Sequence, residues 1–271
     1  MTIAGSDPGG GAGLQADLKT FAAHGVYGFS VITAVIAQNS ARVARIEPVG
    51  ATMVTDQIAT LAAERRPDAL KTGALANAAV VRAVAQAIRE FKLPAPVVDP
   101  VLIASGGARL LDDAGEHALR SLLLPLARVV TPNIPEAEVL TGVTIDGAAA
   151  MRAAARALRR LGARAVVIKG GHPLSGADRH PGVDRRRLVD LLFDGRAFTE
   201  CVTTRIAGGG AHGTGCAFSA AIAAGLARGD DLEAAVRNAQ AFVARAMRAR
   251  FTLGGGNGRA LLDHCPRGHR R

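Results

Sequence analysis

A glycine-rich segment late in the chain has the composition best suited to phosphate chemistry. The segment is Gly208-Gly-Gly-Ala-His-Gly213-Thr-Gly215-Cys216, and an apolar run from Ala217 to Leu226 follows it. Glycines directly before a helix let backbone N–H groups approach an anion, and the helix N-terminus adds partial positive charge. Glycines in this place can also serve only to let a loop turn into a helix. No Lys followed by Ser or Thr comes after them, so the segment is not a P-loop.

The thiol of Cys216 falls where this helix is expected to begin. The helix dipole and neighbouring N–H groups would favour its thiolate, which could act as a base or a nucleophile. Most free cysteines are instead small buried hydrophobes. The place of Cys216 beside the expected anion hole favours the functional interpretation.

Three charged side chains come at or just after apolar runs that look like strands. Asn133-Ile-Pro-Glu136 opens a helix, and Glu136 could hold Mg²⁺ through water or simply compensate the helix N-terminus. Asp99 is a plausible second acid. Lys169 is followed by two glycines and could neutralise phosphate charge, although a lysine at a strand end can also be merely exposed.

The N-terminal loop contains Gly11-x-Gly13-x-x-Ala16, which is similar to a dinucleotide-binding fingerprint. That interpretation needs an acidic residue at the end of the second strand to bind ribose. The strand expected from Phe29 ends in Ala37-Gln-Asn-Ser40, which has no acid. We therefore expect this loop to approach a small polar ligand rather than a dinucleotide.

Short apolar runs alternate with longer amphipathic segments, and this alternation must position the polar groups. We expect strands at residues 2–4, 29–36, 69–71, 97–99, 128–131, 165–169 and 188–193. We expect helices near residues 13–24, 52–65, 77–91, 113–124, 147–161, 214–227 and 231–250. The pattern predicts an α/β fold with a mostly parallel sheet covered on both faces. Ligands bind beyond the carboxyl ends of such strands, so the polar groups should gather there.

Composition narrows the class of protein. The 271 residues are 49% hydrophobic and have a formal net charge of +10, but they include no Trp and one Tyr. Most of the positive charge is arginine scattered over Ala-rich helices, and aromatic faces for stacking bases are scarce, so we do not expect a nucleic-acid partner. Three cysteines without a CxxC pair predict neither a disulfide framework nor a zinc module and fit a reducing cytosol.

The same reading predicts a single domain over residues 1–271 with a cytoplasmic location. No apolar run reaches transmembrane length, and the first residues do not resemble a signal peptide. Residues 175–187 are expected to form a long surface loop, and residues 259–271 a flexible basic tail.

Six segments in this order resemble the hydroxymethylpyrimidine/phosphomethylpyrimidine kinases of thiamine biosynthesis. They are Thr2-Ile-Ala-Gly-Ser-Asp-Pro-Gly-Gly-Gly-Ala-Gly-Leu-Gln-Ala-Asp-Leu-Lys19 with Val31–Asn39, Val98-Asp-Pro-Val, Thr131-Pro-Asn-Ile-Pro-Glu-Ala, Lys169-Gly-Gly-His172 and His212-Gly-Thr-Gly-Cys216. The resemblance spans nearly the whole chain. It implies a ribokinase-like three-layer αβα sandwich, Mg-ATP as phosphate donor, and successive phosphorylation of 4-amino-5-hydroxymethyl-2-methylpyrimidine and its monophosphate. It also suggests a homodimer.

The resemblance also implies roles for single residues. Cys216, Gly213, Gly215 and Lys169 match catalytic positions. The substrate-binding positions match Asp17, Gln38, Gly5, Ala12 and Val101. The nucleotide-binding positions match Lys169, Thr214 and Gly213, and the metal positions match Glu136 and Asp99.

The sequence departs from the family pattern at two places. Leu102-Ile-Ala-Ser105 stands where the family usually has Met, an apolar residue, Ala and Lys, and Lys71-Thr-Gly-Ala74 replaces the more usual Lys-Ile-Gly-Met. These changes could reshape the pocket, so a pyridoxine or pyridoxal kinase remains an alternative. A non-catalytic pyrimidine sensor and a basic nucleic-acid-binding module are further alternatives. A sensor need not keep the phosphoryl-transfer residues, which argues against it.

Overall fold

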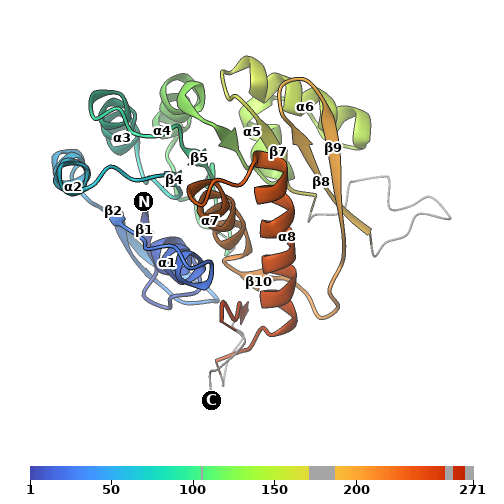
Figure 1. Cartoon of the computed structure of the whole chain (residues 1–271). Helices are drawn as coiled ribbons and strands as arrows, with labels where there is room; N and C mark the ends of the chain where they lie inside the picture. Colours follow the sequence, from blue (N-terminus) through green and yellow to red (C-terminus); the bar gives the residue numbers. More distant parts are fainter. Residues whose placement is uncertain (105, 171–186, 254–258, 266–271) are drawn as a thin grey trace.

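A nine-stranded sheet forms the centre of the computed structural model (Figure 1). The structure describes residues 1–104, 106–170, 187–253 and 259–265. The strand order is β3-β2-β1-β4-β5-β6-β7-β8-β9. The six strands from β2 to β7 in this order are parallel: β2 (Ser30–Gln38), β1 (Thr2–Ser6), β4 (Lys71–Thr72), β5 (Val97–Val98), β6 (Val129–Val130) and β7 (Val166–Ile168). The predicted α/β class with a mostly parallel sheet is confirmed.

The edge strands are antiparallel, and two of them were not predicted. They are β3 (Val43–Pro48) on one side and the pair β8 (Arg187–Phe193) and β9 (Phe198–Thr204) on the other. The residues of β3 are half-buried or exposed, so this strand lacks the apolar run that marks the central strands. The prediction at residues 188–193 corresponds to β8.

Helices cover both faces of the sheet. One hydrophobic core takes side chains from α2 (Ala51–Glu64), α3 (Ala78–Glu90), α4 (Asp113–Ala118), α5 (Ile134–Thr141) and α6 (Ala148–Arg160). A second core takes side chains from α1 (Gly13–Ala23), α7 (Thr214–Ala227) and α8 (Leu232–Arg248). Figure 1 shows α1, α7 and α8 together on the side that faces the viewer. The predicted three-layer arrangement is therefore confirmed.

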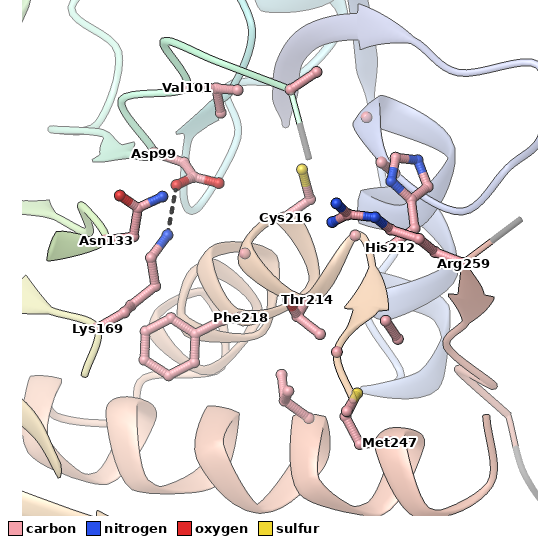
Figure 2. A pocket seen from close by; sticks show the side chains of 18 of the residues that line it. Asp99, Val101, Asn133, Lys169, His212, Thr214, Cys216, Phe218, Met247 and Arg259 are labelled. Carbon is pink, nitrogen blue, oxygen red and sulfur yellow. Dashed lines mark hydrogen bonds and ion pairs between the residues drawn. The ribbon is translucent and has the colours of Figure 1, made fainter. Parts of the chain in front are cut away.

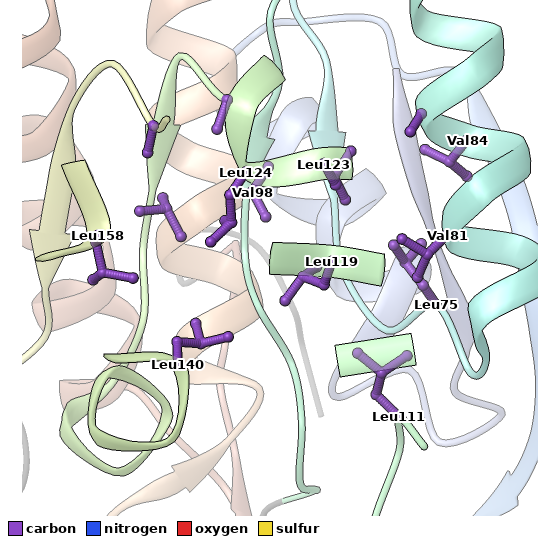
Figure 3. Packing of buried hydrophobic residues seen from close by; sticks show 14 of the residues in the cluster. Leu75, Val81, Val84, Val98, Leu111, Leu119, Leu123, Leu124, Leu140 and Leu158 are labelled. Atoms are coloured by element: carbon purple, nitrogen blue, oxygen red, sulfur yellow. The ribbon is translucent and has the colours of Figure 1, made fainter. Parts of the chain in front are cut away.

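The amphipathic helices show why these segments fold onto the sheet. In α6 the buried residues are Met151, Ala154, Ala155 and Leu158, which follow the i, i+3, i+4, i+7 spacing of one helical face. The arginines of α6 lie off that face. The close packing of leucines and valines over the strands is shown in Figure 3.

The helix predicted at residues 113–124 is divided in the structure. After α4 comes one π-helical turn, Leu119–Leu123, and then a 3₁₀ turn, Leu124–Leu126. Pro125 lies in the first turn of that 3₁₀ segment and has no N–H to continue an α-helical hydrogen-bond ladder.

The C-terminal segment forms a second, two-stranded sheet. In it β11 (Ala260–Leu261) pairs in parallel with β10 (Ala211–His212), and Leu261, Leu262 and His264 are buried. The prediction of a flexible tail from residue 259 is thus wrong for residues 259–265, because its leucines have apolar partners that the local composition does not reveal. The rest of that tail and the predicted loop at 175–187, apart from Arg187, lie outside the described residues.

The single-domain boundary over the whole chain stays a prediction, although one sheet takes strands from residue 2 to residue 204. Within the described part of the chain, none of the helices combines the length and the apolar character needed to cross a bilayer.

Candidate active site

A cavity of about 920 Å³ lies where the carboxyl ends of the central strands meet the start of α7. Its wall includes residues at or after the carboxyl ends of strands β1, β2 and β5 and residues of β9 and α8. Gly5, Ala12, Gln38 and Val101 line one side, and Thr203, Gly208, Val243 and Met247 line the other. Figure 2 shows Val101 and Met247 on opposite sides of the first turn of α7. The cavity can therefore hold two ligands that meet at this helix.

The first turn of α7 has the geometry of an anion-binding site. Gly213 is the N-cap residue with φ 86°, and a side chain there would collide with the carbonyl oxygen of Gly11. No side chain caps the helix, and its first turn carries no acidic residue. Its N–H groups are therefore available to a ligand, and Thr214 and Gly215 line the cavity beside Gly213.

Cys216 follows these residues and is half-buried at the cavity wall. Burial raises the pKa of its thiol to about 11, although the positive charge of Lys71 and the backbone N–H of Gly13 oppose the rise. This net shift opposes the thiolate that the helix N-terminus is expected to favour. Loss of solvation and the negative charges of Asp99 and Asp17 outweigh these stabilising groups.

An ion pair between Lys169 and Asp99 lies beside the same helix turn. The Lys169 ammonium donates to Asp99 Oδ1 at 3.1 Å, and the Ser219 hydroxyl donates to Asp99 Oδ2 at 3.1 Å. A side chain on Gly215 would approach Lys169 Nζ to 3.3 Å, so the ammonium lies close to the anion-binding turn. Burial opposes the charge, but Asp99 and Glu136 raise the pKa of Lys169 above its ordinary value. Lys169 is thus positively charged.

Glu136 closes a capping box at the start of α5. Its carboxylate accepts from the N–H of Asn133 at 2.8 Å, while the Asn133 side chain accepts from the N–H of Glu136 at 2.8 Å. Glu136 therefore takes part in capping α5, and its side chain also lines the cavity. Burial raises the pKa of Glu136 to about 7; Lys169 opposes this and Asp99 adds to it.

The donor set near Lys169 fits Mg²⁺ of the kind that accompanies phosphates. Asp99 and Glu136 present carboxylates to one cavity, and Mg²⁺ typically takes one or two carboxylates together with waters and phosphate oxygens. The described residues contain no group of three or more His, Cys, Asp or Glu side chains that could hold a metal by themselves. These residues would therefore serve a metal that arrives with a phosphate ligand.

The N-terminal loop is organised by Asp7, a residue that our sequence analysis did not single out. Its carboxylate accepts from the N–H groups of Gly9, Gly11 and Ala12 at 2.9, 3.1 and 2.8 Å, and His212 Nε2 lies 3.2 Å from Asp7 Oδ2. Burial alone would raise the pKa of Asp7, but these hydrogen bonds lower it to about 2. The Asp-Pro-Gly-Gly turn signature was the available signal.

The comparisons with known proteins agree with this geometry. A family model described as phosphomethylpyrimidine kinase matches residues 7–260. A hydroxymethylpyrimidine/phosphomethylpyrimidine kinase of Bacillus subtilis is 45% identical over 258 residues, which cover 95% of this chain and 92% of that protein. The chain belongs to this family.

Two further proteins are similar to this member of the phosphomethylpyrimidine kinase family. A thiamine biosynthesis bifunctional protein of Geobacter sulfurreducens is 47% identical over 95% of this chain, which spans only 51% of that longer relative. The structure of the pyridoxal kinase from Staphylococcus aureus in complex with AMP-PCP and pyridoxal superposes with a TM-score of 0.85 at 33% identity, covering 98% of this chain and 93% of that one. The kinase interpretation and the ribokinase-like fold are confirmed at the level of the family.

The structure brings nearly all the predicted site residues of this family member to one cavity. Those on its wall are Gly5, Ala12, Gln38, Asp99, Val101, Glu136, Lys169, Gly213, Thr214, Gly215 and Cys216. Their individual roles stay predictions. Of the positions where the sequence departs from the family pattern, Ala74 lines the cavity and Leu102 is buried, while Ser105 lies outside the described residues.

Asp17 is the exception among the predicted residues. It is fully buried and is not part of the cavity wall; its carboxylate accepts from Lys71 Nζ at 2.8 and 3.0 Å and from the Thr2 hydroxyl at 2.6 Å. We therefore correct its predicted role: Asp17 holds Lys71, and of the two residues Lys71 is the one that belongs to the cavity lining. An acid in an amphipathic helix resembles a solvated one, so the local sequence gave no signal for this pairing.

Proposed function

We propose that this chain transfers phosphate from Mg-ATP to the hydroxymethyl group of 4-amino-5-hydroxymethyl-2-methylpyrimidine and then to the resulting monophosphate. The observation that supports this most strongly is the placement of the anion-binding turn, Cys216 and the Lys169–Asp99 pair between two parts of one cavity. Family membership supports the same reaction, since the family model is described as phosphomethylpyrimidine kinase and the B. subtilis relative is a hydroxymethylpyrimidine/phosphomethylpyrimidine kinase.

In this proposal the pyrimidine occupies the part of the cavity lined by Gly5, Ala12, Gln38 and Val101. The Gln38 amide has both a donor and an acceptor and can pair with an aminopyrimidine edge. The small side chains at Gly5 and Ala12 leave room for the ring. ATP occupies the opposite part, between the glycines that precede α7 and the Val243–Met247 face of α8.

The substrate hydroxyl oxygen forms the new bond to the γ-phosphorus as the bond to the ADP oxygen breaks. The N–H groups of Thr214 and Gly215 and the ammonium of Lys169 stabilise the charge on the transferred group, which is the main task in phosphoryl transfer. Asp99 and Glu136 would hold Mg²⁺, which supplies further charge neutralisation when bound. The hydroxyl proton goes to the thiolate form of Cys216, which lines the cavity at the anion-binding turn and becomes a neutral thiol.

The deciding measurement is ADP release with Mg-ATP and three substrates in parallel: the hydroxymethylpyrimidine, its monophosphate and pyridoxal. Turnover of the first two supports the proposal for both steps. Turnover of pyridoxal alone would assign the chain to the activity named for its structural neighbour from S. aureus. Turnover of none of them would favour a non-catalytic binder.

The Cys216→Ala variant tests the proposed base in the same assay. We expect kcat to fall by about 10²–10⁴-fold with little change in ATP binding, which is the usual contribution of a positioned general base. The thiolate is the minor form at neutral pH because the pKa of Cys216 is about 11. Wild-type kcat should therefore rise with pH above neutrality, and the variant should lack that rise. Unchanged turnover in the variant would exclude Cys216 as the base.

The homodimer rests on the family resemblance and the cytoplasmic location on the cysteine usage of the sequence; both stay proposals.

A further inference from the structure

The C-terminal segment brings an arginine to the anion-binding end of the cavity. Strand β11 pairs with β10 in the register Ala211 to Ala260 and His212 to Leu261. Arg259, the residue before β11, therefore lies at the glycine segment that precedes α7. Its side chain is part of the cavity wall, and Figure 2 shows the guanidinium pointing from β11 towards the start of α7.

The backbone that carries Arg259 is anchored by buried leucines. Leu261 exchanges two backbone hydrogen bonds with Phe251, at 2.8 and 3.1 Å, and its side chain packs against the N-terminal loop at Gly11. Leu262 is buried in the core shared by α1, α7 and α8. The position of the arginine at the cavity thus follows from the pairing and packing of its own strand.

The charges around the cavity distinguish Arg259 from its neighbours. Lys71 and Lys169 also line the cavity, but each is already paired with a carboxylate. The side chain of Arg259 forms neither a hydrogen bond nor an ion pair with any residue in the described part of the chain. A guanidinium has a planar set of donors that matches the oxygens of a phosphate, and here those donors have no partner among the described residues.

A second observation at the same place points to a ligand. His212 precedes the anion-binding turn, and its side chain is only 9% exposed. Its Nε2 is hydrogen-bonded to Asp7, while its Nδ1 is buried without a hydrogen-bond partner among the described residues. Buried polar atoms are normally satisfied, so this atom indicates that a polar group or water occupies the adjacent space in the loaded protein.

We propose that Arg259 is a phosphate-binding residue, which contacts phosphoryl oxygens of a ligand beside the anion-binding turn. This inference rests on the proposed kinase function and adds a contact from the C-terminal strand to it. Two ligands of that function carry phosphoryl oxygens: ATP and the pyrimidine monophosphate. Because each ligand can be titrated on its own, experiment can decide which of the two contacts Arg259.

The test is titration calorimetry without turnover, on wild type, Arg259→Met and Arg259→Lys. The ligands are β,γ-methylene ATP, the pyrimidine monophosphate and the unphosphorylated hydroxymethylpyrimidine. Arg66→Ala is the matched control, because Arg66 is exposed before β4, at the amino end of that strand, and also loses one positive charge.

For Arg259→Met we expect Kd to rise about tenfold or more for one phosphorylated ligand, as for loss of a charged hydrogen bond. Arg259→Lys should recover part of the loss, and the unphosphorylated pyrimidine should bind as in wild type. The affected ligand identifies the source of the phosphate. The proposal is overturned if Arg259→Met binds both phosphorylated ligands with Kd values within about twofold of those of the Arg66→Ala control. It is also overturned if Arg259→Met loses as much affinity for the unphosphorylated pyrimidine as for a phosphorylated ligand. If wild type binds the nucleotide but neither pyrimidine, the proposed substrate fails, and the nucleotide titration still decides the role of Arg259.

Discussion

Two buried ion pairs lie at the same cavity and differ in how completely the protein encloses them. In the Lys71–Asp17 pair both side chains are 0% exposed, and the closest N–O distance is 2.8 Å. In the Lys169–Asp99 pair the side chains are 16% and 2% exposed, and the distance is 3.1 Å. We call the first the sealed pair and the second the open pair.

The difference indicates a division of labour between the two lysines. The sealed pair joins three elements, since Thr2 of β1 also donates to Asp17 of α1, and Lys71 comes from β4. Burial opposes the charge of Lys71, but Asp17 raises the pKa of Lys71 above its ordinary value. Burial also raises the pKa of Asp17, which Lys71 and the Thr2 hydroxyl oppose. The hydrogen bonds from Lys71 and Thr2 fix α1 against the sheet. In the open pair the ammonium of Lys169 lies close to the anion-binding turn, where it can donate to a ligand. The sealed pair is thus suited to hold the structure, and the open pair to bind a changing ligand.

The largest expected effect comes from breaking the sealed pair. Lys71→Met leaves the Asp17 carboxylate buried without a counter-charge, which costs about 3–5 kcal/mol of stability for pairs of this kind. Urea unfolding of Lys71→Met and of Lys169→Met measures the contrast. The open-pair variant should lose much less, because Asp99, although only 2% exposed, lines the cavity and keeps the Ser219 hydroxyl as a donor.

A double variant keeps this test decisive if Lys71→Met does not fold. Asp17→Leu/Lys71→Met removes both charges, and buried pairs replaced by apolar side chains are often close to neutral in stability. It should therefore recover most of the loss. A single variant as stable as wild type would show that the sealed pair does not hold α1 to the sheet.

The second largest expected effect is a pH dependence of stability that comes from Glu136, which lies near the open pair of Asp99 and Lys169. Its pKa is raised from 4.5 to about 7, chiefly by burial. Between these values the unfolded chain has already lost the proton that the folded protein still holds, so stability falls as pH rises from about 4.5 to about 7. The full difference amounts to about 3 kcal/mol.

Glu136→Gln keeps an acceptor for the N–H of Asn133 but cannot ionise. The stability of wild type minus that of the variant should decline across this pH interval and stay level above it, as measured by urea unfolding at each pH. A difference independent of pH would mean that Glu136 is ionised throughout and that burial does not affect it.

The two pairs also show which parts of the site a sequence can predict. Lys169 and Asp99 were found because each lies at the end of an apolar, valine-rich strand, and parallel strands bring their carboxyl ends together. Lys71 opens the short strand β4, but its partner is 54 residues away on a helix, and nothing local marks Asp17 as buried. The resemblance supplied Asp17 as a site residue; only the fold shows it beneath the cavity wall.

Long-range contacts account for the other omissions. His212 meets Asp7 across 205 residues, and β11 pairs with β10 only because buried leucines hold the end of the chain there. The central sheet was predicted because its strands are continuous apolar runs. The edge strand β3 was not, because its exposed residues carry charges that also suit a loop.

The smallest effect in this series is the loss of the open lysine, and it should appear in catalysis rather than in stability. In Lys169→Met, Asp99 keeps the Ser219 hydroxyl as a donor and lies at the cavity, so we expect a stability loss well below that of Lys71→Met. The variant removes a charge that would act on the transferred phosphate, and kcat should fall about 10²-fold, which corresponds to about 2.7 kcal/mol of transition-state stabilisation. Lys169→Arg, with its charge retained, should recover part of the rate. If Lys169→Met instead lost stability like Lys71→Met and kept its kcat, the open pair would be a second structural pair, and the division between the two lysines would be wrong.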